Sequence, residues 1–63
     1  MTSHSILIVE DDKHIAQLVK YNLEKAGFFC EVAMTGEEAL DVLGCESIDL
    51  VILETKHLRG TLN

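Results

Sequence analysis

The stretch Ile6-Leu7-Ile8-Val9-Glu10-Asp11-Asp12 joins four apolar residues to three consecutive carboxylates. Its apolar half has no polar residue at alternate positions, which is typical of a strand covered on both faces in a parallel sheet. Negative charge at the carboxyl end of such a strand needs a cation, a metal-assisted phosphate partner or open water. The stretch therefore predicts the first strand of the fold and the place where its chemistry lies.

Two more apolar runs and two amphipathic segments follow this strand and alternate along the chain. They predict strands near residues 5–10, 28–33 and 48–54 and helices near residues 13–26 and 36–44. Strands that alternate with helices of this length form right-handed crossovers in a parallel sheet. No proline, repeat or low-complexity run marks a linker, so residues 1–63 are expected to form one unit. The expected class is α/β, with the element order βαβαβ.

The predicted helices carry start and stop residues. Asp12 is a good N-cap for the first helix, and Gly27 stands where a left-handed residue ends helices. Thr35, with Glu38 three residues later, forms the capping-box pattern ahead of the second helix, and Gly44 is its expected end. The apolar stripe expected on the first helix consists of Ile15, Leu18, Val19, Asn22, Leu23 and Ala26.

Length and composition narrow the class of protein. A chain of 63 residues is one small domain, which buries only ~60% of its unfolded surface and is expected to need a metal, a partner or a second copy. Five basic against eleven acidic residues give a formal charge of −6, which repels nucleic acid phosphates. The apolar runs are far shorter than the ~20 residues of a membrane helix, and the first residues lack an export signal. We expect a cytoplasmic chain that binds neither nucleic acid nor membrane.

The cysteines and histidines give little support for a disulfide or a soft-metal site. Cys30 and Cys45 lack CxxC spacing and are expected to be small buried hydrophobes in a reducing compartment. His4, His14 and His57 are scattered, without an i, i+4 pair or a neighbouring cysteine. We expect these histidines to be solvated or partly packed.

The carboxylates at strand ends are the main candidates for chemistry. If the first and third strands are parallel neighbours, Glu10, Asp11 and Asp12 come close to Glu54. Crowded carboxylates bind protons more tightly unless a cation compensates them, so a hard cation such as Mg²⁺ suits the crevice. Spacing alone favours a plainer interpretation, in which Asp12 caps a helix and the other carboxylates lie in solvent near its positive end.

Three blocks of the sequence occur in a recognisable order: ILIVEDD at residues 6–12, MTGEEAL at residues 34–40 and IDLVIL at residues 48–53. Together they resemble the receiver domain of bacterial two-component response regulators. The resemblance implies a flavodoxin-like fold, here a truncated one with a three-stranded parallel sheet in the order 2-1-3. It also implies a histidine kinase that donates a phosphoryl group to an aspartate, with Mg²⁺ assisting. By position, Glu10 and Asp11 match the acidic pair that holds the metal.

The family's phosphoacceptor aspartate comes directly after the third strand, where this chain has Glu54. The longer side chain displaces the attacking oxygen by roughly a C–C bond length, and misplacement by about 1 Å can cost ~100-fold in an in-line transfer. Glu54 is therefore expected not to accept a phosphoryl group. An open alternative is that its charge partly imitates phosphoaspartate, although it carries one negative charge where the phosphorylated residue has about two.

After Glu54 the sequence departs from the family pattern. The loop TKHLRG at residues 55–60 has no proline, but the backbone carbonyl of Lys56 matches the metal-binding carbonyl two residues past the acceptor. The chain ends at Asn63, before the family's fourth and fifth strands, so the hydroxyl residue and the lysine of the family site have no counterpart. The expectation is the N-terminal half of a receiver, which a small phosphodonor leaves unmodified even after Glu54→Asp.

In the order 2-1-3 the third strand lies at an edge of the sheet. Its residues Leu50, Val51, Ile52 and Leu53 are all apolar, and an apolar edge strand invites pairing with another chain. Two copies related by a two-fold axis would join these strands antiparallel. We expect a homodimer or a higher oligomer.

Three functional interpretations remain open. In the first, the chain is a degenerate receiver of a phosphorelay, not an enzyme, and binds a partner. In the second, which the loss of resemblance after Glu54 favours, it is a folding or assembly fragment, natural or engineered, with no signalling activity of its own. A nucleotide or flavin binder ranks below both, because no G-x-G-x-x-G or P-loop motif follows the first strand.

Overall fold

The elements of the structure alternate as the sequence predicts. A computed structural model describes residues 4–53 of the chain. Its elements are β1 (Ser5–Val9), α1 (Lys13–Lys25), β2 (Phe29–Ala33), α2 (Gly36–Cys45) and β3 (Leu50–Leu53). The predicted βαβαβ order is confirmed. Neither of the described helices has the length and apolar character needed to cross a membrane.

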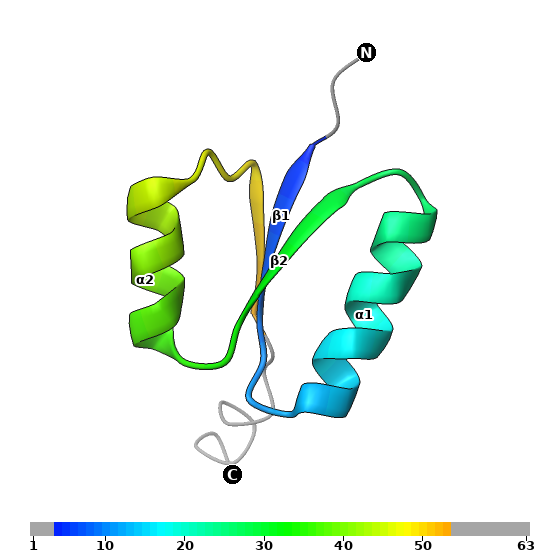
Figure 1. Cartoon of the computed structure of the whole chain (residues 1–63), viewed down its shortest axis with the longest axis horizontal. Coiled ribbons are helices and arrows are strands. Elements are labelled where there is room, and N and C mark those ends of the chain that lie inside the picture. The colour runs from blue at the N-terminus through cyan, green and yellow to red at the C-terminus, as the bar shows by residue number, and fades with distance from the viewer. Residues whose placement is uncertain (1–3, 54–63) are drawn as a thin grey trace, which may run out of the picture.

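The three strands form one parallel sheet in the order β2-β1-β3. β1 is therefore the central strand, and its register pairs Ile6 with Cys30 of β2 and with Leu50 of β3. The helices α1 and α2 lie on opposite sides of the sheet (Figure 1). This strand order and helix placement confirm the predicted flavodoxin-like α/β fold.

Two apolar clusters, one on each face of the sheet, form the core. The cluster beneath α1 contains Ile6, Ile8 and Cys30, packed against Val19, Leu23, Phe28, Val32 and Ile52. The cluster beneath α2 contains Leu7, Ala33 and Ala39, packed against Val9, Val42 and Ile48. Because successive strand residues point to opposite faces, β1 contributes to both clusters, as its lack of polar alternation predicted.

Capping residues define both ends of α1. The Asp12 carboxylate accepts hydrogen bonds from two backbone N–H groups of the first turn, at 2.9 and 3.3 Å, and is the N-cap that the sequence predicts. At the other end Gly27 has a φ of 102°, which glycine adopts without strain. The Phe28 N–H donates to the Leu23 carbonyl at 3.1 Å across this turn. That bond closes the helix in the manner of a Schellman motif.

The apolar stripe of α1 is narrower than expected. Ile15, Val19 and Leu23 are half-buried. Leu18 is 62% exposed, and Asn22 and Ala26 are also exposed. The buried residue of the helix is Ala16, which the predicted stripe did not include. Offsets of three and four residues describe a broad sector of a helix, and only its centre faces the sheet here.

The helix α2 starts with the predicted cap and ends one residue later than predicted. Thr35 Oγ1 accepts a hydrogen bond from the Glu38 N–H at 3.1 Å. Glu38 Oε1 accepts one from the Met34 N–H at 2.9 Å, so the return bond reaches the residue before the cap. Gly44 does not end the helix, because the Glu46 N–H donates to the carbonyl four residues earlier at 2.8 Å.

The strand β3 begins at Leu50, two residues later than predicted. Asp49 instead bonds to the start of β1: its N–H donates to the Ser5 carbonyl at 2.8 Å, and its Oδ2 accepts from the Ser5 N–H at 2.7 Å. The carboxylate thus takes the place of a backbone acceptor. Ile48 precedes the strand and packs into the cluster beneath α2. Its side chain therefore belongs to the core although the residue is not part of β3. The strands β1 and β2 are each one residue shorter than predicted.

Candidate functional site

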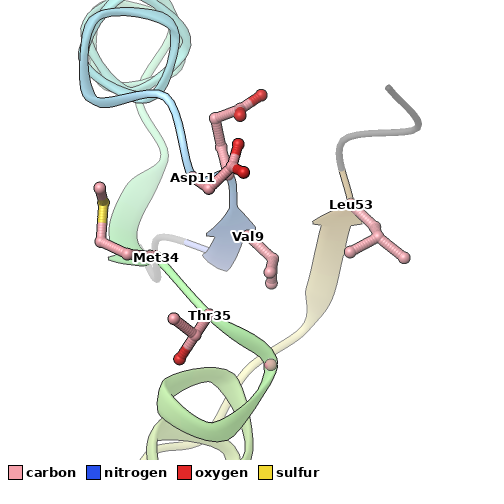
Figure 2. Close-up of a pocket in the computed structure, with 7 residues that line it drawn as sticks. Val9, Asp11, Met34, Thr35 and Leu53 are labelled. Carbon is pink, nitrogen blue, oxygen red and sulfur yellow. The ribbon is translucent and has the colours of Figure 1, made fainter. Parts of the chain in front are cut away.

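The carboxyl ends of β1 and β3 lie side by side, because the register pairs Val9 with Leu53. A pocket of about 260 Å³ opens at this edge of the sheet. Figure 2 shows Val9 between Leu53 on one side and the loop residue Met34 on the other. The lining residues are Val9, Glu10, Asp11, Met34, Thr35, Gly36 and Leu53. The predicted approach of the first and third strands is confirmed.

Glu10 is the buried carboxylate at this edge. It is only 3% exposed. Its backbone N–H donates to the Ala33 carbonyl at 3.0 Å, which extends the pairing of β1 with β2 by one residue. Its Oε1 accepts a hydrogen bond from the Asp12 N–H at 2.9 Å, which ties the side chain to the turn before α1. Both bonds hold the carboxylate in one place, and a buried carboxylate needs such donors or a cation to offset its lost hydration.

Asp11 and Asp12 follow on the same turn and lie in different surroundings. Asp11 is exposed and lines the pocket together with Glu10. Asp12 does not line the pocket, because its side chain caps α1. The exposed His14 imidazole lies 4.0 Å from the Asp12 carboxylate. The plainer interpretation of Asp12 as a helix cap is confirmed, and the expected crevice holds two of these three carboxylates.

The opposite wall of the pocket comes from the loop after β2, which the sequence analysis did not assign to the site. Met34, Thr35 and Gly36 line it, and Figure 2 shows Met34 and Thr35 on this loop. The Thr35 hydroxyl oxygen accepts the capping bond of α2, and Met34 contributes an apolar side chain to this wall. The sequence contained the signal: β2 is the second parallel neighbour of β1, so its carboxyl end reaches the same edge.

The pair Glu10 and Asp11 suits a hard cation, because Mg²⁺ is commonly held by one or two carboxylates and keeps several waters. Within residues 4–53, no group of three or more histidine, cysteine, aspartate or glutamate side chains is placed to hold a metal ion. Glu54, at the phosphoacceptor position, and Lys56, with its predicted carbonyl ligand, lie outside the described residues. The described part of the pocket therefore contains two of the three predicted metal ligands.

Among the described residues, the histidines and cysteines do not line this pocket. His4 is exposed, and its Nδ1 lies 3.7 Å from Oδ2 of Asp49; His57 lies outside the described residues. Cys30 is buried and Cys45 is exposed, and both are free thiols. The expectation of burial is thus confirmed for Cys30 and wrong for Cys45, which ends α2. Burial raises the pKa of the Cys30 thiol above its ordinary value.

The strands and the pocket lie within a region of the sequence that matches a known protein family. The sequence model of the response regulator receiver domain matches residues 6–56. The chain belongs to this receiver family. The matched range covers both helices, β2, β3, all but the first residue of β1, and every residue that lines the pocket. The resemblance seen in the sequence is confirmed, and the receiver is that of a two-component response regulator.

Two curated relatives of this receiver are bacterial regulatory proteins. The receiver is 43% identical over 49 residues to the alkaline phosphatase synthesis transcriptional regulatory protein PhoP of Bacillus subtilis, covering 78% of this chain and 20% of the relative. It is 47% identical over 51 residues to the transcriptional regulatory protein CpxR of Escherichia coli, covering 81% of this chain and 22% of the relative. The chain thus spans about a fifth of the length of these relatives. No solved structure gives a significant match.

Proposed function

We propose that this chain is a degenerate receiver of a two-component phosphorelay, a signalling module and not an enzyme, which does not accept a phosphoryl group itself. The register of β1 and β3 carries the proposal, because it pairs Val9 with Leu53 at the pocket that Glu10 and Asp11 line. Glu54 follows Leu53 in the sequence, so the family's acceptor position comes directly after the strand that borders the acidic pair. Family membership implies a histidine kinase as partner.

The length of the Glu54 side chain is one reason for the proposed loss of phosphoacceptance, and it is the reason that the described residues bear on. Phosphoryl transfer depends almost entirely on positioning and on charge neutralisation. One extra methylene moves the carboxylate by roughly a C–C bond length, and a shift of about 1 Å can cost ~100-fold in rate. The acidic pair is poorly able to follow such a shift, because Glu10 is bonded through its backbone to Ala33 and through its side chain to the Asp12 N–H.

Mg²⁺ is the cation that we propose for the acidic pair. When bound, it supplies neutralisation of charge on a phosphoryl group. Glu10 offers a carboxylate fixed by the turn, and Asp11 offers one from the exposed rim of the pocket. The backbone carbonyl of Lys56 is the proposed third protein ligand.

Incubation with a small phosphodonor and Mg²⁺, followed by intact-mass measurement, tests the loss of phosphoacceptance. We expect no phosphoryl group on the chain or on its Glu54→Asp variant. A mass gain on the unmodified sequence would contradict the proposal. A gain on Glu54→Asp alone would assign the block to the extra methylene, and Asp11→Asn in the same background should then abolish the gain by weakening the metal site.

Self-association through β3 is the second part of the proposal. Leu50, Val51 and Leu53 are 55%, 43% and 57% exposed, and in the described part of the chain β3 pairs on one side only, with β1. The other side presents backbone donors and acceptors to which a second copy can pair antiparallel. Size-exclusion chromatography with light scattering at micromolar protein should show a dimer or larger species; a folded monomer would contradict this part.

The exposed β3 also favours a second candidate function, that of an assembly fragment with no signalling activity of its own. Mg²⁺ titration followed by amide chemical shifts separates the two. A degenerate receiver should show saturable shifts at Glu10 and Asp11 that Asp11→Asn removes, whereas an assembly fragment has no need of a metal. Both functions are proposed for the cytoplasm, without direct contact to nucleic acid, which the formal charge of −6 disfavours.

A further inference from the structure

We propose that Asp12 is a positioning residue for the acidic pair, through which a cation at Glu10 and the first turn of α1 stabilise each other. The Asp12 side chain caps α1 and does not line the pocket, so in this proposal it is not a metal ligand. Its backbone N–H instead holds the side chain of Glu10, one of the two carboxylates at the pocket. This coupling rests on the metal site proposed above and connects that site to the helix.

The link begins at a turn that encloses Asp11. The Asp12 N–H donates to Glu10 Oε1 at 2.9 Å, so the hydrogen bond closes a ring that contains the backbone of Asp11. Figure 2 shows Asp11 on this turn between β1 and α1, and its exposed side chain lines the pocket with Glu10. One hydrogen bond therefore fixes the Glu10 carboxylate relative to the backbone that carries the second carboxylate.

Three further hydrogen bonds join Asp12 to the first turn of α1. Its Oδ1 accepts from the N–H groups of His14 and Ile15, at 2.9 and 3.3 Å. Its backbone carbonyl accepts from the Ala16 N–H at 2.9 Å, which is the first backbone bond of the helix. Because these bonds fix the Asp12 backbone, the first turn sets the direction of the N–H that holds Glu10. If this turn frays, the Glu10 carboxylate loses a donor of fixed direction.

Both ends of the link are buried. Glu10 is 3% exposed, and Ala16 in the first turns of α1 is 1% exposed. Ile15 lies near Glu10 as well, because both line a cavity of about 100 Å³ together with Val19 and Ile52 of the cluster beneath α1. Side chains in a packed interior transmit displacements to their neighbours. A shift of the first turn therefore changes the surroundings of the Glu10 carboxylate.

The coupling between cation and turn is reciprocal, because each changes the free energy of the other. While Asp12 holds Glu10, the carboxylate needs little further ordering to bind a cation. A released Glu10 side chain must be ordered on binding, which lowers affinity about two- to tenfold. By the same factor, a cation that fixes Glu10 favours the N–H direction found in the closed turn. Mg²⁺ should therefore stabilise the first turn of α1 as well as the pocket.

Amide hydrogen exchange with and without saturating Mg²⁺ tests transmission from the pocket to the helix. We expect Mg²⁺ to slow exchange about fivefold at the N–H groups of His14 and Ile15. The Phe28 N–H, which donates to the Leu23 carbonyl at the other end of α1, is the internal control and should change less than about twofold. Equal slowing at both ends would mean that bound metal stabilises the fold as a whole, and it would overturn the proposal.

Variants of Asp12 test transmission in the opposite direction. Asp12→Ala removes the cap, whereas Asp12→Asn keeps a capping oxygen. Both remove the same negative charge, so the difference between them reports the cap and not the attraction of a carboxylate for the cation. We expect Asp12→Ala to bind Mg²⁺ about threefold more weakly than Asp12→Asn, less than the full coupling because an uncapped turn still closes part of the time.

Gly27→Ala is the matched control for lost stability. It strains the other end of α1, because a φ of 102° is unfavourable for alanine, while no atom lies within 4 Å of the added methyl group. It should destabilise the fold about as much as Asp12→Ala and leave Mg²⁺ affinity unchanged. Equal losses of affinity in Gly27→Ala and Asp12→Ala would show that general destabilisation weakens the site. The exchange measurement uses the natural sequence and decides the question even if Asp12→Ala does not fold.

The outcomes separate the coupling from the metal site itself. Mg²⁺-dependent chemical shifts at Glu10 and Asp11 without slower exchange at His14 and Ile15 would keep the site and overturn the coupling. Equal Mg²⁺ affinities of Asp12→Ala and Asp12→Asn would do the same. No Mg²⁺ binding to the natural sequence would overturn both the site and the coupling.

Discussion

The strands β1 and β3 have the same kind of sequence and opposite surroundings. Ile6, Leu7 and Ile8 of β1 are 3%, 0% and 2% exposed, whereas Leu50, Val51 and Leu53 of β3 are 55%, 43% and 57% exposed. The two strands pair with each other, so composition does not explain the difference. In the described part of the chain, β1 has a strand on each side and contributes to the clusters beneath both helices, while β3 has one neighbouring strand and contributes only Ile52 to a cluster beneath a helix. An apolar sequence makes burial of a strand favourable, but the position of the strand in the sheet decides whether it is buried.

The strands β1 and β3 therefore differ in what they contribute to the protein. β1 contributes residues to both core clusters and is followed directly by Glu10 of the acidic pair. β3 borders the same pocket through Leu53 but leaves apolar surface outside. We therefore expect the stability of the fold to depend more on β1 than on β3, and β3 is the strand that we propose for self-association.

The largest expected effect is on stability. Leu7→Ala removes a side chain with no exposed surface and should lower the free energy of unfolding by about 3 kcal/mol, from lost burial and a residual cavity. Leu50→Ala makes the same change on β3 and should cost less than about 1 kcal/mol. Urea unfolding of both variants at one protein concentration measures the two losses. Equal losses would remove the distinction between the strands.

The next effect concerns the two edges of the sheet. Val51→Lys places a charge on β3 and should raise the dissociation constant of the proposed dimer about tenfold or more. Phe29→Lys makes the equivalent change on β2, the opposite edge, where Phe29 is 50% exposed, and should leave the dimer intact. Light scattering over a protein dilution series measures both. If only Phe29→Lys dissociates the dimer, the interface lies on β2 and not on β3.

The register of such a dimer can be tested further. Opposite residues of an antiparallel pair lie on the same face, so a two-fold axis passes at a residue and not between two residues. A pair centred on the four-residue strand places the axis at Val51 or Ile52. With Cys45 replaced by serine, we expect either Val51→Cys or Ile52→Cys to form an intermolecular disulfide in high yield. The other variant serves as its control. Cross-linking by neither would contradict a symmetric β3 pair.

A smaller effect is expected where β1 leads into α1. Asp12→Ala removes the N-cap bonds and should cost about 1 kcal/mol of stability, whereas Asp12→Asn should cost less because the amide oxygen still caps. Mg²⁺ affinity distinguishes this cap from the acidic pair: Asp11→Asn should weaken it about tenfold, and Asp12→Asn should change it little. Chemical denaturation and NMR titration provide the two measurements. A large loss of Mg²⁺ affinity in Asp12→Asn would show that Asp12 is part of the metal site.

The smallest effect is a pH dependence centred on Cys30, which packs against Ile6 and Ile8 of β1. Burial, followed by the negative charge of Glu24, raises its thiol pKa from 9.0. The fold therefore favours the neutral thiol, and this contribution is fully present below pH 9.0 and is lost as the pH rises toward the folded-state pKa. The free energy of unfolding should fall more steeply at alkaline pH in the natural sequence than in Cys30→Ala. Equal slopes would show that other groups dominate.

Thiol alkylation provides an independent measurement of the same burial. The exposed Cys45 should react at a rate typical of a free thiol, and the buried Cys30 should react only as the chain opens. Intact-mass analysis over time resolves one fast and one slow addition. Two equally fast additions would mean that the cluster beneath α1 opens readily.

Much of this fold follows from short-range patterns. The apolar run before Glu10, the Asp12 cap and the turn at Gly27 predicted β1 and α1, and all three features are present. The errors lie where long-range contacts take over. Leu18 belongs to the periodic stripe of α1, but it lies outside the contact between that helix and the sheet. Ile48 was predicted to lie in the third strand, but it precedes β3 and packs into the cluster beneath α2. Periodicity identifies a face, and packing decides how much of that face is used.

The candidate site was predictable to a similar extent. Strand order placed Glu10 and Asp11 at the edge shared with Leu53, and the pocket contains all three. The wall formed by Met34 and Thr35 was not predicted, because neither residue carries a charge that marks the loop after β2 as part of a site. Any residue after a parallel strand reaches this edge, whatever its side chain.

The sequence by itself determined the order of the elements, their caps and the position of the acidic pair, because these depend on contacts over a few residues along the chain. Only the tertiary structure decided which apolar strand is buried and how much of the apolar stripe of α1 packs on the sheet. These outcomes depend on residues far apart in sequence: the same kind of apolar run is core when strands and helices surround it and stays largely exposed when they do not.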